Sequence, residues 1–164
     1  MRDDPASGKN GQLELERFVP FRLNRLAVAV SEKLSEIYRD TFGLDVPGWR
    51  VLVTVCAGEG CTAQHIVAST RMHKTRVSRA VAALIERKLI ERTASATDAR
   101  ELPLHATKAG EQLYQRLVPL ALARERQILS CLDAPQQQAF LEAIDRLEAS
   151  LDLSEMEDIS EAVE

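Results

Sequence analysis

The sequence predicts a mainly helical protein, in which long amphipathic helices at both ends of the chain flank a compact helix-turn-helix unit and a β-hairpin. Apolar residues recur every three or four positions in the first and last thirds of the chain, as on one face of a helix. Between them, two shorter helical segments are separated by about three residues, the spacing of a helix-turn-helix. After Ile90 the apolar period changes to two, which is typical of strands.

The composition is that of one ordinary globular unit. Of the 164 residues, 45% are hydrophobic and 28% are charged, values that exclude a fibrous or largely disordered chain. The longest apolar run, residues 51–57, is far shorter than the roughly 18 residues that span a bilayer. The first twelve residues form a polar leader without an apolar signal core. We therefore expect a cytoplasmic protein with no membrane partner.

The first long helix is predicted to have Pro20 in or near its first turn and to stop at Gly43. Asp45 is expected to cap a second helix that runs through residues 47–57, which Gly58 and Gly60 close. The first helix carries its apolar residues on one side: Leu23, Leu26, Ala27, Val30, Leu34, Ile37 and Tyr38.

The third and fourth helices, residues 62–69 and 73–88, are predicted to form the helix-turn-helix unit. Residues 89–95 and 99–106 follow as two short strands, joined by a polar tip at residues 95–100. The fourth helix buries one stripe of side chains: Val77, Ala80, Val81, Leu84 and Ile85.

Two further helices follow the hairpin. Thr107 is expected to cap the first, which Pro119 should bend, and residues 133–138 open the second. The small central unit cannot bury the apolar faces of the long terminal helices. We therefore expect a homodimer in which both ends of the chain interlock, with a self-contained monomeric bundle as the alternative. The segment 152–164 has six acidic residues and no basic one, and is expected to be a frayed or disordered tail.

Positive charge is concentrated in the helix-turn-helix segment. Arg71, Lys74, Arg76 and Arg79 lie within nine residues, and residues 60–85 contain no Asp or Glu. The formal net charge of the chain is −4, and it becomes −8 when these four cations are set aside. Such segregation indicates a surface for a polyanion. The alternative is a solvated helix face whose arginines pair with Glu86 and other carboxylates.

The residue types of this segment suit double-stranded DNA. Arg76 and Arg79 are one turn apart, where each can pair bidentately with guanine in the major groove. Arg100 on the hairpin tip can enter the minor groove, and Asp98 can hold an arginine in place. The remaining predicted DNA contacts are short hydroxyls and one cation suited to phosphate or to a thymine methyl: Ser69, Thr70, Lys74, Thr75 and Ser78.

Three segments together resemble the MarR family of winged helix-turn-helix transcription regulators. They are "GWRVL" (48–52), "MHKTRVSRAVAALIERKLIER" (72–92) and "DARELPLHATKAGE" (98–111), and the match extends from about residue 20 to residue 150. The resemblance implies a recognition helix at 73–88, a β wing that carries Arg100, and a dimer interface made by the first, fifth and sixth helices. It also implies a repressor that sits on a pseudo-palindromic operator and leaves when a small ligand binds.

On this basis the chain divides into five parts. These are a leader at 1–12, an N-terminal dimerisation helix at 13–44, a winged DNA-binding lobe at 45–106, C-terminal dimerisation helices at 107–151 and an acidic tail at 152–164.

Two residues depart from the usual pattern of the family. Members often have an acidic residue where His73 stands, so we expect the start of this recognition helix to contact DNA or to respond to pH differently. Members commonly have Gly where Lys88 stands. Because a left-handed cap disfavours a non-Gly residue by about 1–2 kcal/mol, we expect this helix to end in another way.

The effector pocket implied by the family lies between the dimerisation helices and the DNA-binding lobe. Near it, Phe18, Phe21 and Trp49 are candidate apolar walls, and the candidate anion partners are Arg17, Arg22 and Arg25. This combination favours a flat anionic ligand, such as an aromatic carboxylate or its coenzyme A thioester. The alternative is that the aromatic residues belong to the core and the arginines to the surface.

A thiol-based redox switch is the competing sensor. Cys61, close to a helix N-terminus, is its best candidate, whereas Cys56 lies in an apolar helix and Cys131 late in a dimerisation helix. None matches the near-N-terminal cysteine of the family's peroxide-sensing branch, so we expect reduced structural thiols.

Other classes of function have less support. A winged-helix module that binds another protein is an alternative, and the acidic tail could serve it. An enzyme is not expected, because His65, His73 and His105 lack ligand spacing with the cysteines and no nucleophile motif is present. We therefore predict no catalytic residue, no bound metal and no cofactor.

Overall fold

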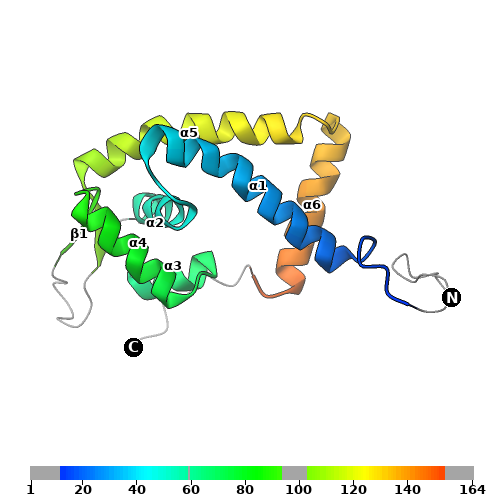
Figure 1. The fold of residues 1–164 in the computed structure, drawn as a ribbon, viewed down its shortest axis with the longest axis horizontal. Helices are drawn as coiled ribbons and strands as arrows, with labels where there is room; N and C mark the ends of the chain where they lie inside the picture. The colour runs from blue at the N-terminus through cyan, green and yellow to red at the C-terminus, as the bar shows by residue number, and fades with distance from the viewer. Residues whose placement is uncertain (1–11, 59, 94–102, 154–164) are drawn as a thin grey trace.

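The computed structural model describes residues 12–58, 60–93 and 103–153. Within them the chain forms six helices and one two-stranded sheet (Figure 1). The elements follow in the order α1 (Val19–Phe42), α2 (Val46–Ala57), α3 (Ala63–Thr70), α4 (Lys74–Glu86), β1 (Ile90–Arg92), β2 (Leu104–Ala106), α5 (Lys108–Leu129) and α6 (Ala134–Ser150). The predicted mainly helical fold with a two-stranded wing is confirmed. None of the helices in these ranges combines the length and the apolar run needed to cross a membrane.

Local capping signals set where the helices begin. Pro20 lies in the first turn of α1, and the Asp45 carboxylate accepts the Gly48 N–H at 2.8 Å to start α2. Thr107 caps α5 by accepting the Gly110 N–H at 3.1 Å. In α6, Asp133 and Gln136 form a reciprocal capping box. These starts are read correctly from the sequence because each bond joins residues three apart.

The ends of α1 and α4 both use a left-handed residue. Gly43 ends α1 with φ +61°, as expected of glycine. The expectation that Lys88 avoids this conformation is wrong, because its φ is +57°. The reversal lets the Leu89 N–H donate to the Leu84 carbonyl at 2.9 Å, and it turns Leu89 and Ile90 into the core. Burial of two large apolar side chains therefore outweighs the strain at Lys88.

The wing is shorter within the described residues than the strands predicted for it. Strands β1 and β2 are antiparallel and pair Ile90 with Ala106 and Arg92 with Leu104. Leu104 also bridges to Cys61 in the α2–α3 connection, with N–O distances of 2.8 and 3.1 Å in the two directions. The wing base is thereby fixed to the helix-turn-helix unit.

The core lies in the lobe built by α2, α3, α4 and the sheet, and it is closed by the C-terminal part of α1 and the first half of α5. Tyr38 of α1 stacks on Trp49 of α2 with ring centroids 4.8 Å apart. The Arg116 guanidinium of α5 lies 5.5 Å from the centroid of the Phe42 ring. The core includes Val51, Leu52, Val55, Ile66, Val77, Val81, Leu84, Ile90, Leu104 and Leu117.

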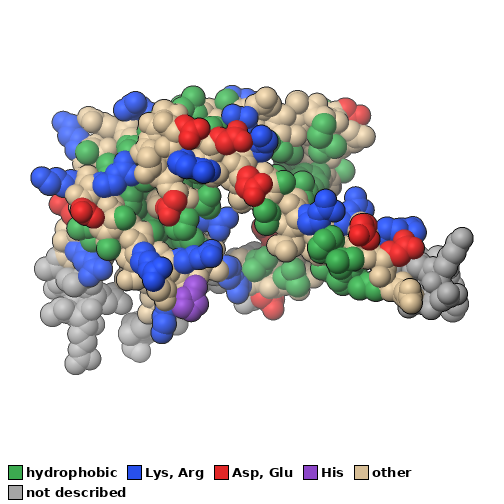
Figure 2. Space-filling view, viewed as in Figure 1, with side chains coloured by type: hydrophobic (Ala, Val, Ile, Leu, Met, Phe, Trp, Pro, Cys, Tyr) green, Lys and Arg blue, Asp and Glu red, His purple; other side chains and the backbone are tan. Residues whose placement is uncertain are grey.

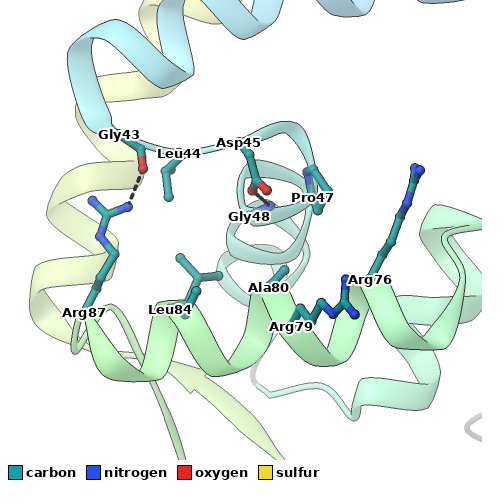
Figure 3. A pocket seen from close by; sticks show the side chains of 11 residues that line it. Gly43, Leu44, Asp45, Pro47, Gly48, Arg76, Arg79, Ala80, Leu84 and Arg87 are labelled. Carbon is teal, nitrogen blue, oxygen red and sulfur yellow. Dashed lines mark hydrogen bonds between the residues drawn. The ribbon is translucent and has the colours of Figure 1, made fainter.

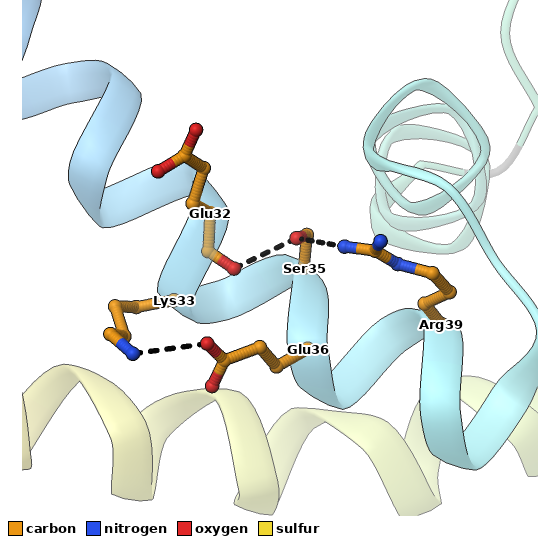
Figure 4. A network of polar contacts seen from close by, with 5 residues as sticks. All are labelled: Glu32, Lys33, Ser35, Glu36 and Arg39. Atoms are coloured by element: carbon orange, nitrogen blue, oxygen red, sulfur yellow. Dashed lines mark hydrogen bonds and ion pairs between the residues drawn. The ribbon is translucent and has the colours of Figure 1, made fainter.

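A short polar network lies on α1 where this helix passes α5 (Figure 4). The Ser35 hydroxyl donates to the Glu32 carbonyl at 2.8 Å and accepts from the Arg39 guanidinium at 2.8 Å. Lys33 and Glu36 form an exposed ion pair at 3.0 Å, and the hydrogen bond from Lys33 lowers the pKa of Glu36. Ser35 is buried, and this network satisfies its hydroxyl within its own helix.

The outer helices leave apolar side chains uncovered. In the described chain α6 buries none of its residues, and a green apolar surface extends over α6 and the N-terminal half of α1 in Figure 2. The exposed large apolar residues are Leu13, Leu15, Val19, Leu23, Leu26, Val28, Leu120, Leu122, Leu141, Leu147, Leu151 and Leu153. A single protomer exposes too much apolar surface on both ends of the chain to be the final assembly.

Two expectations for the α5 region need adjustment. Pro119 lies inside α5 without ending it, and the helix continues to Leu129. Cys131 is not part of that helix; it lies in the turn after it, exposed, with its thiol 3.6 Å from the Ile128 carbonyl.

Candidate nucleic-acid interface

Helix α4 forms a ridge at the surface, and its cationic face points to solvent. Its apolar stripe of Val77, Ala80, Val81 and Leu84 is buried, which leaves the opposite face outside. Arg76 is among the residues exposed there. The blue side chains in Figure 2 gather along the edge where α3 and α4 lie. The periodicity of α4 thus fixes which residues it presents.

The first of two grooves beside this ridge, the α2–α4 groove, has a volume of about 600 Å³. The turn between α1 and α2 forms one wall and α4 the other. In Figure 3, Arg87 lies at one end of the groove, with Arg76 and Arg79 toward the other. Its lining consists of Gly43, Leu44, Asp45, Pro47, Gly48, Arg76, Arg79, Ala80, Ala83, Leu84 and Arg87.

The second groove, the α3–α4 groove, lies on the other side of the ridge and has a volume of about 770 Å³. Its cations are Lys74, Arg79 and Arg92, and it has no acidic lining residue. The rest of its lining is Ala63, Gln64, Val67, Thr75, Val77, Ser78 and Val81. A helix that stands between two cationic grooves has the shape and charge to enter a duplex groove with a phosphate backbone on either side.

The cations of the ridge are not neutralised by neighbours within the described chain. The ion pairs found there join Arg17 to Glu14 and Lys33 to Glu36, both on or beside α1. No described carboxylate lies within ion-pair distance of Lys74, Arg76 or Arg79. The alternative in which these arginines pair with Glu86 therefore finds no support in the described residues.

The predicted hydroxyl contacts fall into two groups. Ser69 and Thr70 at the end of α3 donate their hydroxyl protons to the Ile66 carbonyl, so these protons are engaged. Thr75 and Ser78 are exposed on α4. The backbone N–H of Thr75 donates to His73 Nδ1 at 3.3 Å, which makes His73 the N-cap of α4. Asp98 and Arg100, the predicted wing-tip contacts, lie outside the described residues.

Arg87 holds the C-terminal end of α4 and was missed by sequence reasoning. Its guanidinium donates to the Phe42 carbonyl at 2.8 Å and to the Gly43 carbonyl at 2.9 Å. No local signal marks this contact, because its partners lie more than forty residues earlier in the chain. Arg92 was missed in the same way, since it joins the α3–α4 groove only through the pairing of β1 with β2.

The N-terminus of α5 is fastened to the residue after α4. Thr107 donates its N–H to the Leu89 carbonyl at 3.0 Å and its hydroxyl to the Lys88 carbonyl at 2.7 Å. Gly110 packs so closely on Leu89 that a Cβ there would lie 3.0 Å from the Leu89 carbonyl carbon and well within contact distance of its oxygen. Together with Arg87, these contacts connect the position of α4 to both long helices.

The predicted effector residues are not brought together within one chain. Arg22 and Arg25 line a shallow depression of about 480 Å³ on the N-terminal half of α1, with Glu16, Val19, Leu23, Leu26 and Ala29. The Arg25 guanidinium lies 5.6 Å from the centroid of the Phe21 ring. Arg17 pairs with Glu14, and Phe18 is the N-cap residue of α1. Trp49 packs on Tyr38, about 25 Å along α1 from Phe21 at 1.5 Å per residue.

The two inner cysteines are poor thiolates. Burial raises the pKa of the Cys61 thiol to about 11. Burial, with smaller contributions from Glu111 and Cys61, raises the pKa of Cys56 to about 11. In the described ranges no group of three or more His, Cys, Asp or Glu residues is placed to hold a metal ion.

Comparisons with known proteins agree with this geometry. Residues 42–101 match the sequence model of the MarR family. A MarR/EmrR family transcriptional regulator from Acinetobacter sp. ADP1 superposes with a TM-score of 0.77 and 26% identity, over 85% of this chain and 99% of that one. No curated protein matches the sequence.

Two similar structures contain ligands. CouR from Rhodococcus jostii RHA1, bound to p-coumaroyl-CoA, has a TM-score of 0.73 and 23% identity, over 84% of this chain and 94% of that one. A MarR family protein from Mycobacterium tuberculosis in complex with p-aminosalicylic acid has a TM-score of 0.67 and 21% identity, over 79% and 98%. The sequence match over the DNA-binding lobe and the shared fold lead to one conclusion: this chain belongs to the MarR family of DNA-binding, winged helix-turn-helix transcription regulators.

Proposed function

We propose that this regulator is a homodimeric repressor that places α4 in the major groove of each half of a pseudo-palindromic operator. The observation that carries the proposal is the exposed ridge of Lys74, Arg76 and Arg79, which no described carboxylate neutralises. Arg76 and Arg79 are assigned to base edges, and Lys74, Thr75 and Ser78 to phosphates or a thymine methyl. Repression follows when a dimer on the operator blocks access of the transcription machinery.

A second copy of the chain is the proposed cover for the apolar ends. Family membership implies a dimer, and the uncovered residues lie on α1, α5 and α6. Interlocking these helices removes that surface from water at about 25 cal/mol per Å². It also fixes the separation of two α4 ridges, which a palindrome of successive major grooves requires.

The DNA-binding proposal is tested by fluorescence anisotropy with a duplex from the region upstream of the protein's own gene. The logarithm of the affinity should fall linearly with the logarithm of the salt concentration. Arg76→Ala and Arg79→Ala should each weaken binding by roughly 5- to 150-fold, the equivalent of about 1–3 kcal/mol. Arg146→Gln, an equal charge change on exposed α6, is the matched control and should change affinity less than twofold. If the dimer does not bind this duplex even at low salt, a protein-interaction module becomes the better reading.

We propose further that the effector is a small anionic aromatic compound, either an aromatic carboxylate or its coenzyme A thioester. Guanidinium groups beside an aromatic ring suit such a ligand, and Arg22, Arg25 and Phe21 are so arranged. Two proteins of the same fold were crystallised with p-coumaroyl-CoA and p-aminosalicylic acid, which supports this chemical class. The depression on α1 is open in one protomer, so the dimer partner must complete it.

The effector proposal is tested with a panel of aromatic acids and their thioesters, scored for release of the upstream duplex. At least one should release the protein, and Arg22→Gln with Arg25→Gln should raise the concentration needed by about tenfold or more without changing DNA affinity. If the double variant responds like wild type, the ligand binds elsewhere. Release by peroxide alone would favour the thiol switch, which the raised pKa of Cys61 disfavours.

A further inference from the structure

The C-terminal end of α6 lies beside the turn that precedes the recognition helix. Arg71, in that turn, reaches the backbone carbonyl of Asp152 with a long N–O distance of 3.5 Å, although the two residues are 81 positions apart. Both residues adopt left-handed conformations, with φ of 53° and 52°. The described chain therefore comes to within one residue of its end, Leu153, next to the cationic edge of α3 and α4.

The charges on the two sides of this junction are opposite. Residues 154–164 contain five acidic side chains and no basic one: Glu155, Glu157, Asp158, Glu161 and Glu164. The edge carries Arg71, Lys74, Arg76 and Arg79, which are exposed, and residues 60–85 have no acid at all. A carboxylate chain presents the same kind of charge to these cations as a row of DNA phosphates.

The length of the segment is sufficient. Residues 153–164, fully extended, span up to about 40 Å. Helix α4 has 13 residues, which corresponds to about 20 Å at 1.5 Å per residue. A segment that starts beside Arg71 can therefore reach Arg79 at the middle of the helix with ample slack.

We propose that the acidic segment 154–164 docks on the cationic edge of α3 and α4 and competes with DNA for it. The segment acts as an intramolecular counter-ion: it suppresses weak binding to arbitrary duplex, while an operator that also offers base contacts displaces it. The inference rests on the proposed DNA-binding role of α4. It adds regulation by the protein's own C-terminus to that role.

The test compares two triple variants that change the net charge equally. Glu157→Gln, Asp158→Asn and Glu161→Gln neutralise the segment, whereas Glu142→Gln, Asp145→Asn and Glu148→Gln neutralise three exposed acids of α6. Affinity for an arbitrary duplex is measured by anisotropy at about 50 and 300 mM salt. The first variant should bind at least about fivefold more tightly at low salt and less than twofold more tightly at high salt, because screening weakens the competition. The α6 variant should change less than twofold at either concentration.

Equal effects of the two variants, or no effect of the first, would overturn the proposal. Deletion of residues 154–164 should reproduce the first variant and guards against an effect of the substitutions themselves. If no form binds duplex, including the deletion variant, the proposed DNA-binding role fails. If wild type binds and the segment variants match it, only the present inference fails.

Contact is tested directly by placing a nitroxide on Ser160→Cys in a Cys131→Ser background, since Cys56 and Cys61 are shielded by burial. Amide signals of α3 and α4 should broaden in the free protein and recover when duplex is added. Broadening that spares these helices, or that persists with DNA bound, would contradict docking at this edge.

Discussion

Substitution of Gly110 by Ala tests the link between the DNA-binding lobe and α5. Helix propensity alone predicts that Gly110→Ala stabilises the protein by about 0.5–1 kcal/mol, because Gly110 lies in the first turn of α5. The structure predicts the opposite sign. An added Cβ would lie 3.0 Å from the carbonyl carbon of Leu89 and closer still to its oxygen, and backbone atoms cannot rotate aside as a side chain can.

The magnitude follows from what must move. Relief requires the first turn of α5 to withdraw from Leu89 by about 1 Å, which stretches the 3.0 Å bond from the Thr107 N–H to the Leu89 carbonyl beyond hydrogen-bond range. The 2.7 Å bond from the Thr107 hydroxyl to the Lys88 carbonyl weakens with it. Two lost bonds at about 0.5–1.5 kcal/mol each, with overpacking strain of about 1–3 kcal/mol, exceed the gain in propensity. We expect a net loss of about 2–4 kcal/mol.

Urea unfolding followed by circular dichroism measures this loss, at one fixed protein concentration because a dimer's stability depends on concentration. Ala109→Gly, at the exposed neighbouring position, is the matched control and should lose only about 0.5–1 kcal/mol through propensity. If Gly110→Ala left the free energy of unfolding unchanged or raised it, the close contact between α5 and Leu89 would be refuted.

Three further outcomes are expected from the same geometry. Lys88→Gly should raise the free energy of unfolding by about 0.5–1 kcal/mol, since relief of the left-handed strain exceeds the added freedom of the unfolded chain; the urea midpoint reports it. Arg87→Met should lose about 1–2 kcal/mol with its two bonds to α1 carbonyls, and Arg87→Lys should recover at most half. In a thiol-labelling assay at pH 8, the exposed Cys131 should react first. With a pKa of about 11, only roughly 0.1% of Cys56 and Cys61 is thiolate at that pH, against about a quarter for an ordinary thiol.

Each of these outcomes has a result that would contradict it. Glu86→Gly, inside α4, should destabilise by about 1 kcal/mol; a similar loss for Lys88→Gly would mean that Lys88 is not strained. An Arg87→Met protein as stable as wild type would show that α4 is held by its apolar stripe alone. Three equivalents of thiol labelled at one rate in the folded protein would show that Cys56 and Cys61 are accessible thiolates, and would reopen the redox alternative.

The DNA-binding ridge was readable from the sequence because it depends on local repeats. The spacing of Val77, Ala80, Val81 and Leu84 defines the buried stripe of α4, and the same period places Arg76 on the outer face. Whether a cation on that face is free or paired is a question about neighbours in space. The sequence left both readings open, and the described ion pairs decide between them.

The sensor region shows the limit of sequence proximity. Phe18, Phe21 and Trp49 lie within a 32-residue stretch, yet α1 is a rigid rod that holds Trp49 against Tyr38 and leaves Phe21 near its other end. Closeness along the chain does not become closeness in space when a long helix intervenes. The opposite case is Arg71 and Asp152, which are far apart in sequence and adjacent in the fold.

By itself the sequence determined the order of the helices, their first residues and the charged face of α4, because caps and periodicity act over three or four residues. Only the tertiary structure decided that Lys88 takes a left-handed conformation, that Arg87 ties α4 to α1, and that Gly110 lets α5 approach Leu89. These features arise where buried surface from distant segments must fit together. The energy of that fit outweighs the local preference of any single residue.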